Sequence, residues 1–472
     1  MNPSNGWLLV APHGVQALSS GHLNCASQNY YGSYIDADKV YTVFKVEDEG
    51  CAQAISEFNQ DFKYFAPAPS SDSQLVWLRK SAIDPSLKSD SEDPLIYLQD
   101  LWGPTSRGGQ DTQVVLEGHQ RVSNRAFEVH YASDNAVLLS MDSSRAAHID
   151  TSLPAFWKST LLPTSPSSYI PVPPSAIEPV KHILENLRFN PQVASVVNNI
   201  SLAQIKNDVR FLTGEDGESG IVSRHSFSKG AVTAAHWLKE RVEATGASCR
   251  LMPFLTGFAP NVICRYAAIR DTNTTVLISG HYDSRGSFGS VRAPGGDDDG
   301  SGTTGVLSVA RTIARKGVKF HSNVELAFFA GEEQGLLGSR AYAKELRSTD
   351  ANLLLMIQAD MTAYRAPGEP LQLGLPDIIG TSEVTQLVAN ISNIYTPELK
   401  VGFTPACCSD HQSFHEQGFP ASQVFERAGP IADPMYHNSG DLSDRENYDF
   451  EQLRSIAKVQ FATLLHAAGF EL

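Results

Sequence analysis

Apolar, strand-like segments alternate with segments of helical periodicity through the second half of this chain, and this alternation restricts its fold more than any other feature. Helices are expected at 229–247, 302–316, 336–346, 382–395 and 450–468, and strands at 275–281, 324–330, 353–360 and 421–425. Strands that alternate with helices build a mostly parallel sheet with helices on both faces. We therefore expect a three-layer α/β fold with a central mixed, mostly parallel sheet, whose ligands bind at the carboxyl ends of the strands.

The first part of the chain has a different pattern. Short alternating segments, such as 112–117 and 127–131, are separated by clusters of Asp, Ser, Gly and Pro, which predicts a strand-rich N-terminal domain. A Pro- and Ser-rich stretch at 161–175 can hold neither a helix nor a central strand. We divide the chain into a strand-rich domain at 1–163, a linker at 164–175 and a second domain at 176–472. A role of the first domain as a pro-region or a lid is a hypothesis.

Composition and charge exclude several classes of protein. Hydrophobic residues make up 42% and charged residues 19% of the 472 residues, which is ordinary for a folded globular protein. The formal net charge of −15 would repel a phosphate backbone and an anionic membrane surface, so neither nucleic acid nor a membrane is an expected partner. No apolar run approaches the roughly 20 residues that a membrane-spanning helix needs. The start of the chain offers a short apolar run at 7–11 and no convincing signal peptide.

Cysteines and glycosylation triplets say little about the compartment. The six cysteines are scattered except for the adjacent Cys407 and Cys408, which predicts neither a disulfide-dense scaffold nor a metal knuckle. Triplets that begin at Asn199, Asn273 and Asn390 would accept N-glycans in a secreted chain, and they favour export.

Five polar clusters in the second half of the chain follow or flank the expected strands. They are 280–284 (GHYDS), 293–302 (APGGDDDGSG), 328–339 (FFAGEEQGLLGS), 356–361 (MIQADM) and 434–441 (PMYHNSGD). Taken singly, each has an ordinary explanation as a local hydrogen bond, a helix cap or a solvated loop. Taken together, most of them lie where successive parallel strands deliver residues to one edge of the sheet.

Two histidines and three carboxylates from these clusters are a suitable donor set for two divalent metal ions. Zinc accepts imidazole nitrogen and carboxylate oxygen, and two metals about 3.5–4 Å apart can share one carboxylate and one hydroxide. Two dications would also neutralise carboxylates that otherwise repel each other. Activation of a water requires a neighbouring base, and one glutamate of the pair at 332–333 can serve.

These motifs resemble those of the secreted bacterial and fungal leucyl aminopeptidases, the co-catalytic di-zinc exopeptidases of metallopeptidase family twenty-eight in clan MH. The resemblance spans roughly 199–472. The motifs that occur in the family's order and approximate spacing are His281-Tyr282-Asp283, 296–302, 331–336, Asp360-Met361-Thr362, Ser409-Asp410-His411 and His437. The resemblance implies an α/β zinc-exopeptidase fold and two Zn²⁺ ions per chain.

Carried over motif by motif, the resemblance also implies which residues would bind these ions. One zinc ion would be held by His281 and Asp360, the other by Glu333 and His437, with Asp298 as the bridge between them.

Two further carboxylates take roles beside these ligands. Asp283 would orient His281, because a ligating imidazole usually donates its other N–H to a carboxylate. Glu332 would be the general base that takes a proton from the metal-bridging water and then the acid that protonates the departing amine. The resemblance also implies a cis peptide bond between Asp298 and Asp299.

The sequence departs from the family at one place. Before Ser409 the family often carries two cysteines separated by three residues, with a tyrosine between them that helps to stabilise the oxyanion. Here the two cysteines, Cys407 and Cys408, are adjacent, so the local disulfide cannot form in its usual manner, and the tyrosine position corresponds to Ala406. Loss of one oxyanion donor slows turnover by roughly a hundredfold unless another group replaces it. Tyr436 and Tyr364 are the candidates for that replacement.

The predicted function is therefore zinc-dependent removal of N-terminal residues from peptides by a metal-bridged hydroxide, with Glu332 as base. A carboxypeptidase or glutaminyl-cyclase relative is an alternative on the same scaffold, and a non-catalytic interaction protein without metals is another. Kinship with exported peptidases and the sequons predict a secreted protein. The substrate is a peptide, and the sequence makes no prediction of oligomeric state.

Overall fold

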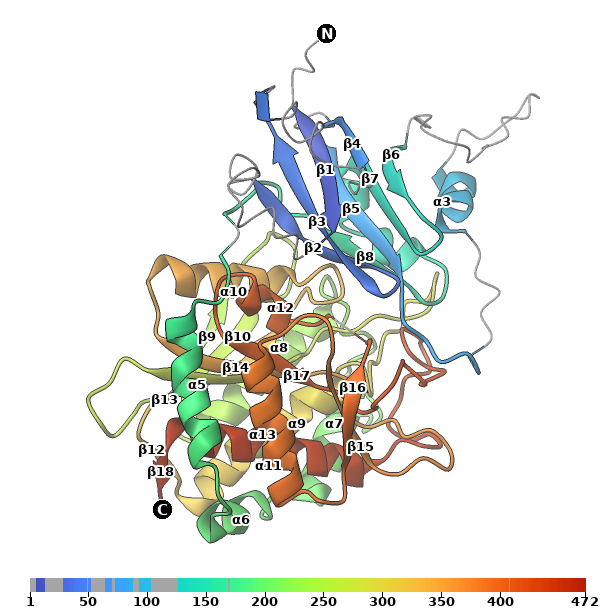
Figure 1. The fold of residues 1–472 in the computed structure, drawn as a ribbon. Coiled ribbons are helices and arrows are strands. Elements are labelled where there is room, and N and C mark those ends of the chain that lie inside the picture. The colour runs from blue at the N-terminus through green and yellow to red at the C-terminus, as the bar shows by residue number, and fades with distance from the viewer. Residues whose placement is uncertain are drawn as a thin grey trace, which may run out of the picture. The chain divides into compact units, whose positions relative to one another are not determined.

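The computed structural model describes residues 6–12, 29–48, 50–51, 64–69, 73–87, 93–102, 126–168, 170–406 and 408–472 (Figure 1). The chain forms two compact units, which are described separately. Unit 1 contains Met1–Ser81 and Ser89–Tyr169, and unit 2 contains Ala82–Lys88 and Ile170–Leu472. The strand predicted at 112–117 lies outside the described residues.

Unit 1 contains two antiparallel four-stranded sheets with the strand orders β2-β3-β1-β4 and β6-β7-β5-β8. The strands are β1 (Trp7–Pro12), β2 (Tyr30–Asp36), β3 (Lys39–Val46), β4 (Tyr64–Pro67), β5 (Ser73–Lys80), β6 (Phe127–Ala132), β7 (Ala136–Asp142) and β8 (Trp157–Leu161), with the short helices α3 (Pro94–Trp102) and α4 (Ser143–Ala146) and the 3₁₀ turn Ile149–Ser152. The buried Trp77 ring stacks on Tyr34 of the other sheet at 5.3 Å and on Tyr131 at 5.5 Å. The two sheets therefore share one aromatic core, and the prediction of a β-rich N-terminal region is confirmed.

The centre of unit 2 is a six-stranded sheet with the order β17-β14-β11-β13-β10-β9. Its strands are β9 (Ser248–Met252), β10 (Asn261–Tyr266), β11 (Thr275–His281), β13 (Asn323–Phe329), β14 (Leu353–Ala359) and β17 (Ala421–Val424). The four strands from β17 to β13 run parallel, β10 runs antiparallel to β13, and β9 runs antiparallel to β10. Every residue of β11 and β13 is buried, as expected for strands covered on both faces.

Helices cover both faces of this sheet (Figure 1). They are α5 (Pro174–Asn186), α6 (Pro191–Val197), α7 (Leu202–Thr213), α8 (Lys229–Glu243), α9 (Gly300–Lys316), α10 (Leu337–Ser348), α11 (Ser382–Tyr395), α12 (His411–His415) and α13 (Phe450–Ala468). Val276 and Ile278 of β11 pack with the larger group of helices, which includes α9, α11 and α13, and Leu277 packs on the other face with α10 and α12. The predicted three-layer α/β fold with a mostly parallel sheet is thus confirmed. No helix among the described residues is long and apolar enough to cross a membrane.

The predicted elements of unit 2 agree closely with the observed ones. The strand expected at 275–281 coincides with β11, and the helices expected at 382–395 and 450–468 coincide with α11 and α13. Helix α9 begins two residues before its predicted start, because the Asp299 side chain caps it by accepting the N–H of Gly302 at 2.9 Å. Helix α5 begins at Pro174, inside the stretch predicted to be linker, since proline is favoured in the first turn of a helix.

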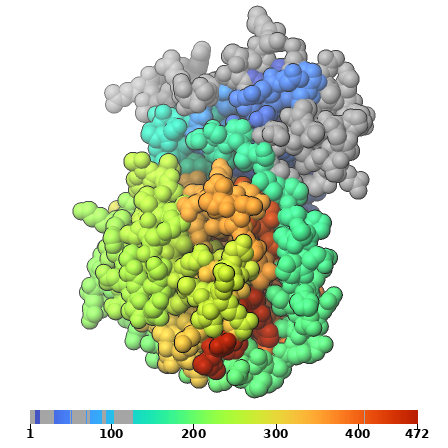
Figure 2. Space-filling view, turned by 90° about the vertical axis from the view of Figure 1, so that its left-hand side faces the viewer, coloured from blue at the N-terminus to red at the C-terminus, as the bar shows by residue number. Residues whose placement is uncertain are grey.

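Two small sheets complete unit 2. Strand β12 (Lys319–Phe320) pairs with β18 (Phe470–Glu471), and β15 (Gln372–Pro376) pairs with β16 (Lys400–Thr404). In the space-filling view the red C-terminal residues lie at the surface of this unit beside yellow ones (Figure 2). The first pairing ties the end of the chain to the connection between α9 and β13.

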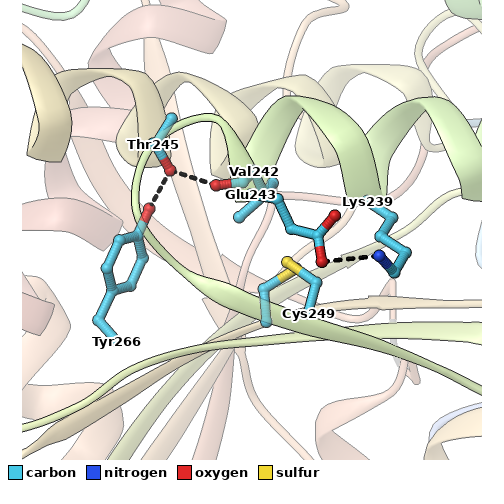
Figure 3. The surroundings of a disulfide bond; sticks show 7 residues. Lys239, Val242, Glu243, Thr245, Cys249 and Tyr266 are labelled. Atoms are coloured by element: carbon cyan, nitrogen blue, oxygen red, sulfur yellow. Dashed lines mark hydrogen bonds and ion pairs between the residues drawn. A yellow bond between two sulfur atoms is a disulfide. The ribbon is translucent and has the colours of Figure 1, made fainter.

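A disulfide joins Cys249 of β9 to Cys264 of β10, which face each other in the antiparallel register (Figure 3). It lies beside the end of α8, where Thr245 Oγ1 contacts the Tyr266 hydroxyl at 2.5 Å. Cys51 and Cys408 are disulfide-bonded as well. Cys407 is outside the described residues, so the expectation that the family's local disulfide is missing stays a prediction.

Candidate metal centre

The carboxyl ends of the parallel strands carry the predicted site residues to one edge of the sheet. His281 is the last residue of β11, and Asp360 directly follows β14. Glu332 and Glu333 are in the loop between β13 and α10. Because these strands run parallel, residues separated by up to about 80 positions meet at this edge.

Two groups of three side chains have ligand atoms close enough to share a metal ion. The first is His281, Asp298 and Asp360, and the second is Asp298, Glu333 and His437, with the ligand atoms in each group within 4.8 Å of one another. Asp298 belongs to both groups.

The two oxygens of Asp298 face different histidines. Its Oδ1 lies 3.2 Å from Nε2 of His281, and its Oδ2 lies 3.2 Å from Nε2 of His437. His281 Nε2 is also 3.6 Å from Asp360 Oδ1, and His437 Nε2 is 2.9 Å from Glu333 Oε2. The tertiary structure thus brings all five of these residues together.

The donor atoms of this cluster fit a bound cation. Among the described residues, the buried Nε2 atoms of His281 and His437 and both carboxylate oxygens of Glu333 have no hydrogen-bond partner. A buried polar atom without a partner costs free energy, about 1–3 kcal/mol for a neutral group and more for a charged one. Imidazole nitrogen and carboxylate oxygen are the ligands that zinc accepts, and zinc would satisfy these atoms.

Electrostatics show how strongly the carboxylates act on the histidines. Burial lowers the pKa of His281, but the Asp360, Asp283 and Asp298 carboxylates outweigh it and raise this pKa well above its usual value. Burial raises the pKa of Asp298, yet the nearby His281 and His437 imidazoles bring it well below its usual range. Without metal, the positive charge in this cluster is therefore carried by a proton, for which a metal ion would compete.

Asp283 contacts His281 and also supports the loop of the two glutamates. Its Oδ1 lies 3.4 Å from Nδ1 of His281, whose nearer contact is the Asp283 carbonyl oxygen at 3.2 Å. Asp283 also accepts the backbone N–H groups of Glu332 and Glu333 at 3.4 and 3.3 Å and the Ser226 hydroxyl at 2.9 Å. One buried carboxylate therefore links the end of β11 to the loop after β13.

The three adjacent aspartates divide their contacts. Asp297 Oδ1 accepts the N–H of Ala363, and Asp299 accepts the N–H groups of His281, Gly302 and Met361. Of the three carboxylates, that of Asp298 lies against the imidazole rings of His281 and His437. The peptide bond between Asp298 and Asp299 is cis, as the resemblance implied.

Two residues that the sequence did not single out organise the turn that contains these aspartates. The fully buried Arg224 donates to the carbonyl oxygens of Tyr282, Leu212 and Gly295 at 2.7, 3.0 and 2.7 Å and to that of Pro294. Asp441 accepts the N–H groups of Asp297 and Asp298. Asp441 ends a motif that was noted for its histidine, but a lone buried arginine leaves no local signal in a sequence.

Arg285, four residues after His281, contacts the far side of His437. Its Nη1 lies 3.1 Å from Nδ1 of His437. A guanidinium only donates hydrogen bonds, so Nδ1 is the acceptor here, whereas a neutral imidazole that binds metal through Nε2 carries its proton on Nδ1. If His437 bound a metal through Nε2 as a neutral imidazole, this contact would have to open.

The two candidate oxyanion tyrosines differ in position. The Tyr436 ring stacks on the His437 ring at 3.8 Å, whereas the Tyr364 ring lies beside the Arg445 guanidinium at 5.3 Å. Ser409, from the motif after Ala406, is buried. Tyr436 is thus the candidate in direct contact with His437, one of the predicted metal ligands.

Comparison with known proteins identifies the family. The profile of peptidase family M28 matches residues 261–464. A probable leucine aminopeptidase of Arthroderma otae is 31% identical over 300 residues, which cover 60% of this chain and 78% of that protein. Leucine aminopeptidase 1 of Sclerotinia sclerotiorum is 34% identical over 194 residues, 38% of this chain and 49% of its own.

Solved structures support the fold. LapB from Legionella pneumophila has a TM-score of 0.59 at 16% identity and covers 84% of this chain and 100% of its own. The LapA aminopeptidase of the same organism has a TM-score of 0.56 at 16% identity, with 86% and 100% covered. The family profile and the leucine aminopeptidase relatives confirm the prediction of a metallo-aminopeptidase, and the chain belongs to peptidase family M28.

Proposed function

We propose that this chain is a di-zinc aminopeptidase that removes N-terminal residues from peptides. The observation that carries the proposal is the position of Asp298, whose two carboxylate oxygens each lie 3.2 Å from a different histidine. His281 and Asp360 would hold one zinc ion, Glu333 and His437 the other, and Asp298 both.

The chain's own residues have distinct tasks in this reaction. When bound, two zinc ions supply Lewis-acid polarisation of the scissile carbonyl and lower the pKa of a water. Glu332 would take a proton from the attacking water and deliver it to the departing amine. Asp283 orients His281 and keeps the backbone of Glu332 and Glu333 in place. The buried setting of Glu332 limits competing solvation of its carboxylate.

Compartment and covalent structure are consistent with a secreted glycoprotein, which is also part of this proposal. The Cys249–Cys264 disulfide fits an oxidising compartment. Two of the three sequon asparagines, Asn199 and Asn273, are exposed. Measuring a glycan mass on the protein from culture medium tests this point.

Metal content measured together with activity tests the central proposal. The purified protein should contain close to two zinc ions per chain and should cleave an unblocked aminoacyl substrate, but not its N-acetylated form. A carboxypeptidase would instead tolerate the acetyl group and require a free C-terminal carboxylate. Cyclisation of N-terminal glutamine without hydrolysis would indicate the glutaminyl-cyclase alternative. Absence of stoichiometric zinc and of hydrolysis would reject the enzyme in favour of an interaction protein.

A further inference from the structure

A short piece of the first part of the chain belongs to the peptidase unit. Residues Ala82–Lys88 group with unit 2, although the chain before and after them, Met1–Ser81 and Ser89–Tyr169, forms unit 1. The chain therefore passes from unit 1 into unit 2 and back again before the linker. We call the described part of this segment, 82–87, the strap.

The strap pairs with the backbone of the loop that follows β17. Ile83 forms a parallel bridge with Ile431. The N–H of Asp84 donates to the Ile431 carbonyl oxygen at 2.7 Å, and the N–H of Ile431 donates to the Ala82 carbonyl oxygen at 2.8 Å. Ile431 itself is buried, so both of its backbone polar groups are satisfied by the strap rather than by solvent.

A three-residue ionic cluster adds to this pairing. Arg427 Nη1 lies 2.8 Å from Asp84 Oδ2, and its Nη2 lies 2.7 Å from Glu369 Oε1. The Arg427 side chain is only 16% exposed, and its Nη1 also donates to the Pro430 carbonyl oxygen at 2.7 Å. Hydrogen bonds from Ser86 and the nearby Arg427 guanidinium lower the pKa of Asp84 to about 2, so this carboxylate is charged at any pH where the protein would work.

The loop held by the strap leads to a metal-site histidine. Glu426, next to Arg427, donates its N–H to the Met361 carbonyl oxygen at 2.9 Å, one residue beyond Asp360. Further along, Arg445 holds Asp433, and His437 follows with a positive φ of 55°. A non-glycine residue adopts such a backbone conformation only where its surroundings enforce it.

We propose that Asp84 and Arg427 are positioning residues that fix the loop carrying His437, so that the polypeptide preceding the linker supplies a permanent part of the peptidase unit. The inference rests on the proposed function for the identity of His437 as a ligand. If these residues fix the loop, the N-terminal part of the chain cannot be removed without a loss to the peptidase unit. Removal of everything before Pro174 would also remove the strap, and would leave Arg427 and the Ile431 backbone without these partners.

The test compares Asp84→Ala, the conservative Asp84→Glu and a variant whose residues 82–87 are replaced by six Gly and Ser residues. Asp38→Ala, at an exposed aspartate of unit 1, is the matched control. Each full-length protein is loaded with zinc, and zinc release to a chromogenic chelator is timed. Loss of a group hydrogen-bonded to a metal ligand weakens metal binding by about 10–100-fold, and Asp84, which acts on His437 only through Arg427 and the loop, belongs at the lower end of that range. We expect release of one of the two ions to be about tenfold faster in Asp84→Ala and in the Gly/Ser variant, and near wild type in Asp84→Glu and Asp38→Ala.

Two further measurements separate positioning from a general loss of stability. In Asp84→Ala, kcat should fall below the wild-type value while KM changes little. Excess zinc should restore kcat. In metal-free protein, hydrogen exchange of a peptide covering 427–437 should be faster in Asp84→Ala, with exchange elsewhere in unit 2 unchanged. Zinc release that is unchanged in both Asp84→Ala and the Gly/Ser variant would overturn the inference. If even the wild-type protein binds no zinc, the proposed function fails, and the exchange measurement alone decides whether the strap fixes the loop.

Discussion

The carboxylate of Asp441 holds the backbone of Asp298, 143 residues away in the chain, by accepting its N–H on Oδ2 at 3.0 Å. The same side chain accepts the N–H of Asp297 and contacts Arg445 Nη2 at 3.0 Å. Both aspartate amides are buried, and Arg445 is mostly so. Asp441 therefore fixes the backbone that carries Asp298, the proposed bridging residue.

Replacing Asp441 by Ala should destabilise the protein strongly. The change leaves two buried N–H groups and part of a buried guanidinium without acceptors, which costs about 3–5 kcal/mol. Urea unfolding of the metal-free protein measures this loss. Asp444→Ala is the matched control, since that side chain is exposed. Equal stability of the two variants would contradict the role of Asp441.

Replacing Glu332 by Gln should abolish proton transfer and leave metal binding intact. General acid–base catalysis contributes about 10²–10⁴-fold, so kcat should fall by that factor. Zinc content should stay at the wild-type value, because Glu332 is not one of the proposed ligands. Glu345→Gln, which changes a partly exposed glutamate paired with Arg250, should keep full activity. Undiminished turnover by Glu332→Gln would rule out its assignment as the base.

Replacing Asp298 by Ala should remove both metal ions, whereas Asp360→Ala should remove one. The reason is that Asp298 belongs to both ligand groups and Asp360 to the first group only. Elemental analysis after dialysis, normalised to protein, gives the number of ions per chain. Circular dichroism of each variant confirms that it is folded. Two zinc ions retained by Asp298→Ala would refute a bridging position.

Removing the Cys249–Cys264 disulfide should lower stability with little change in activity. The bond closes a loop with a sequence separation of 15, for which the chain-entropy estimate is about 3 kcal/mol. The variant carries Cys249→Ala and Cys264→Ala together, so that no free thiol is left, and its unfolding midpoint is compared with that of the exposed-site variant Ser248→Ala. An unchanged midpoint would contradict a stabilising role of this disulfide.

His411 should make the fold sensitive to acid. Burial lowers the pKa of His411 to about 4, below its usual 6.5, and its Nε2 lies 3.0 Å from the Ile379 carbonyl oxygen. Between these values the unfolded chain binds a proton that the folded chain does not, so the free energy of unfolding falls as the pH decreases from 6.5 to 4. At pH 5 the free energy of unfolding is therefore roughly 2 kcal/mol lower than at neutral pH or above.

His411→Gln keeps a donor for Ile379 and removes this titration. Urea unfolding of both metal-free proteins at pH 8 and pH 5 measures the effect. The decrease in the free energy of unfolding from pH 8 to pH 5 should be smaller in the variant by roughly 2 kcal/mol. An identical pH dependence in both proteins would show that His411 is not responsible.

Local pattern was enough to predict most of the central sheet and its helices. Strands β11 and β13 are mostly apolar and are buried throughout because both faces are covered, and helices α11 and α13 repeat apolar residues at helical spacing. Such signals depend on neighbours a few positions away. The antiparallel pair β9 and β10 and helix α7 were not predicted. Strand β9 has no fully buried residue, so its pattern does not mark it as a core strand.

The amino-acid sequence by itself determined which side chains with metal-binding chemistry the chain carries and, through the order of strands and helices, that they meet at one edge of a sheet. Only the tertiary structure decided that Arg224 and Asp441 support the aspartate turn and that the strap pairs with Ile431. These contacts join residues that are far apart in the chain through backbone amides and carbonyl oxygens, which every residue type possesses. Because backbone groups are the same at every position, no pattern of side chains along the sequence reveals which of them will be paired.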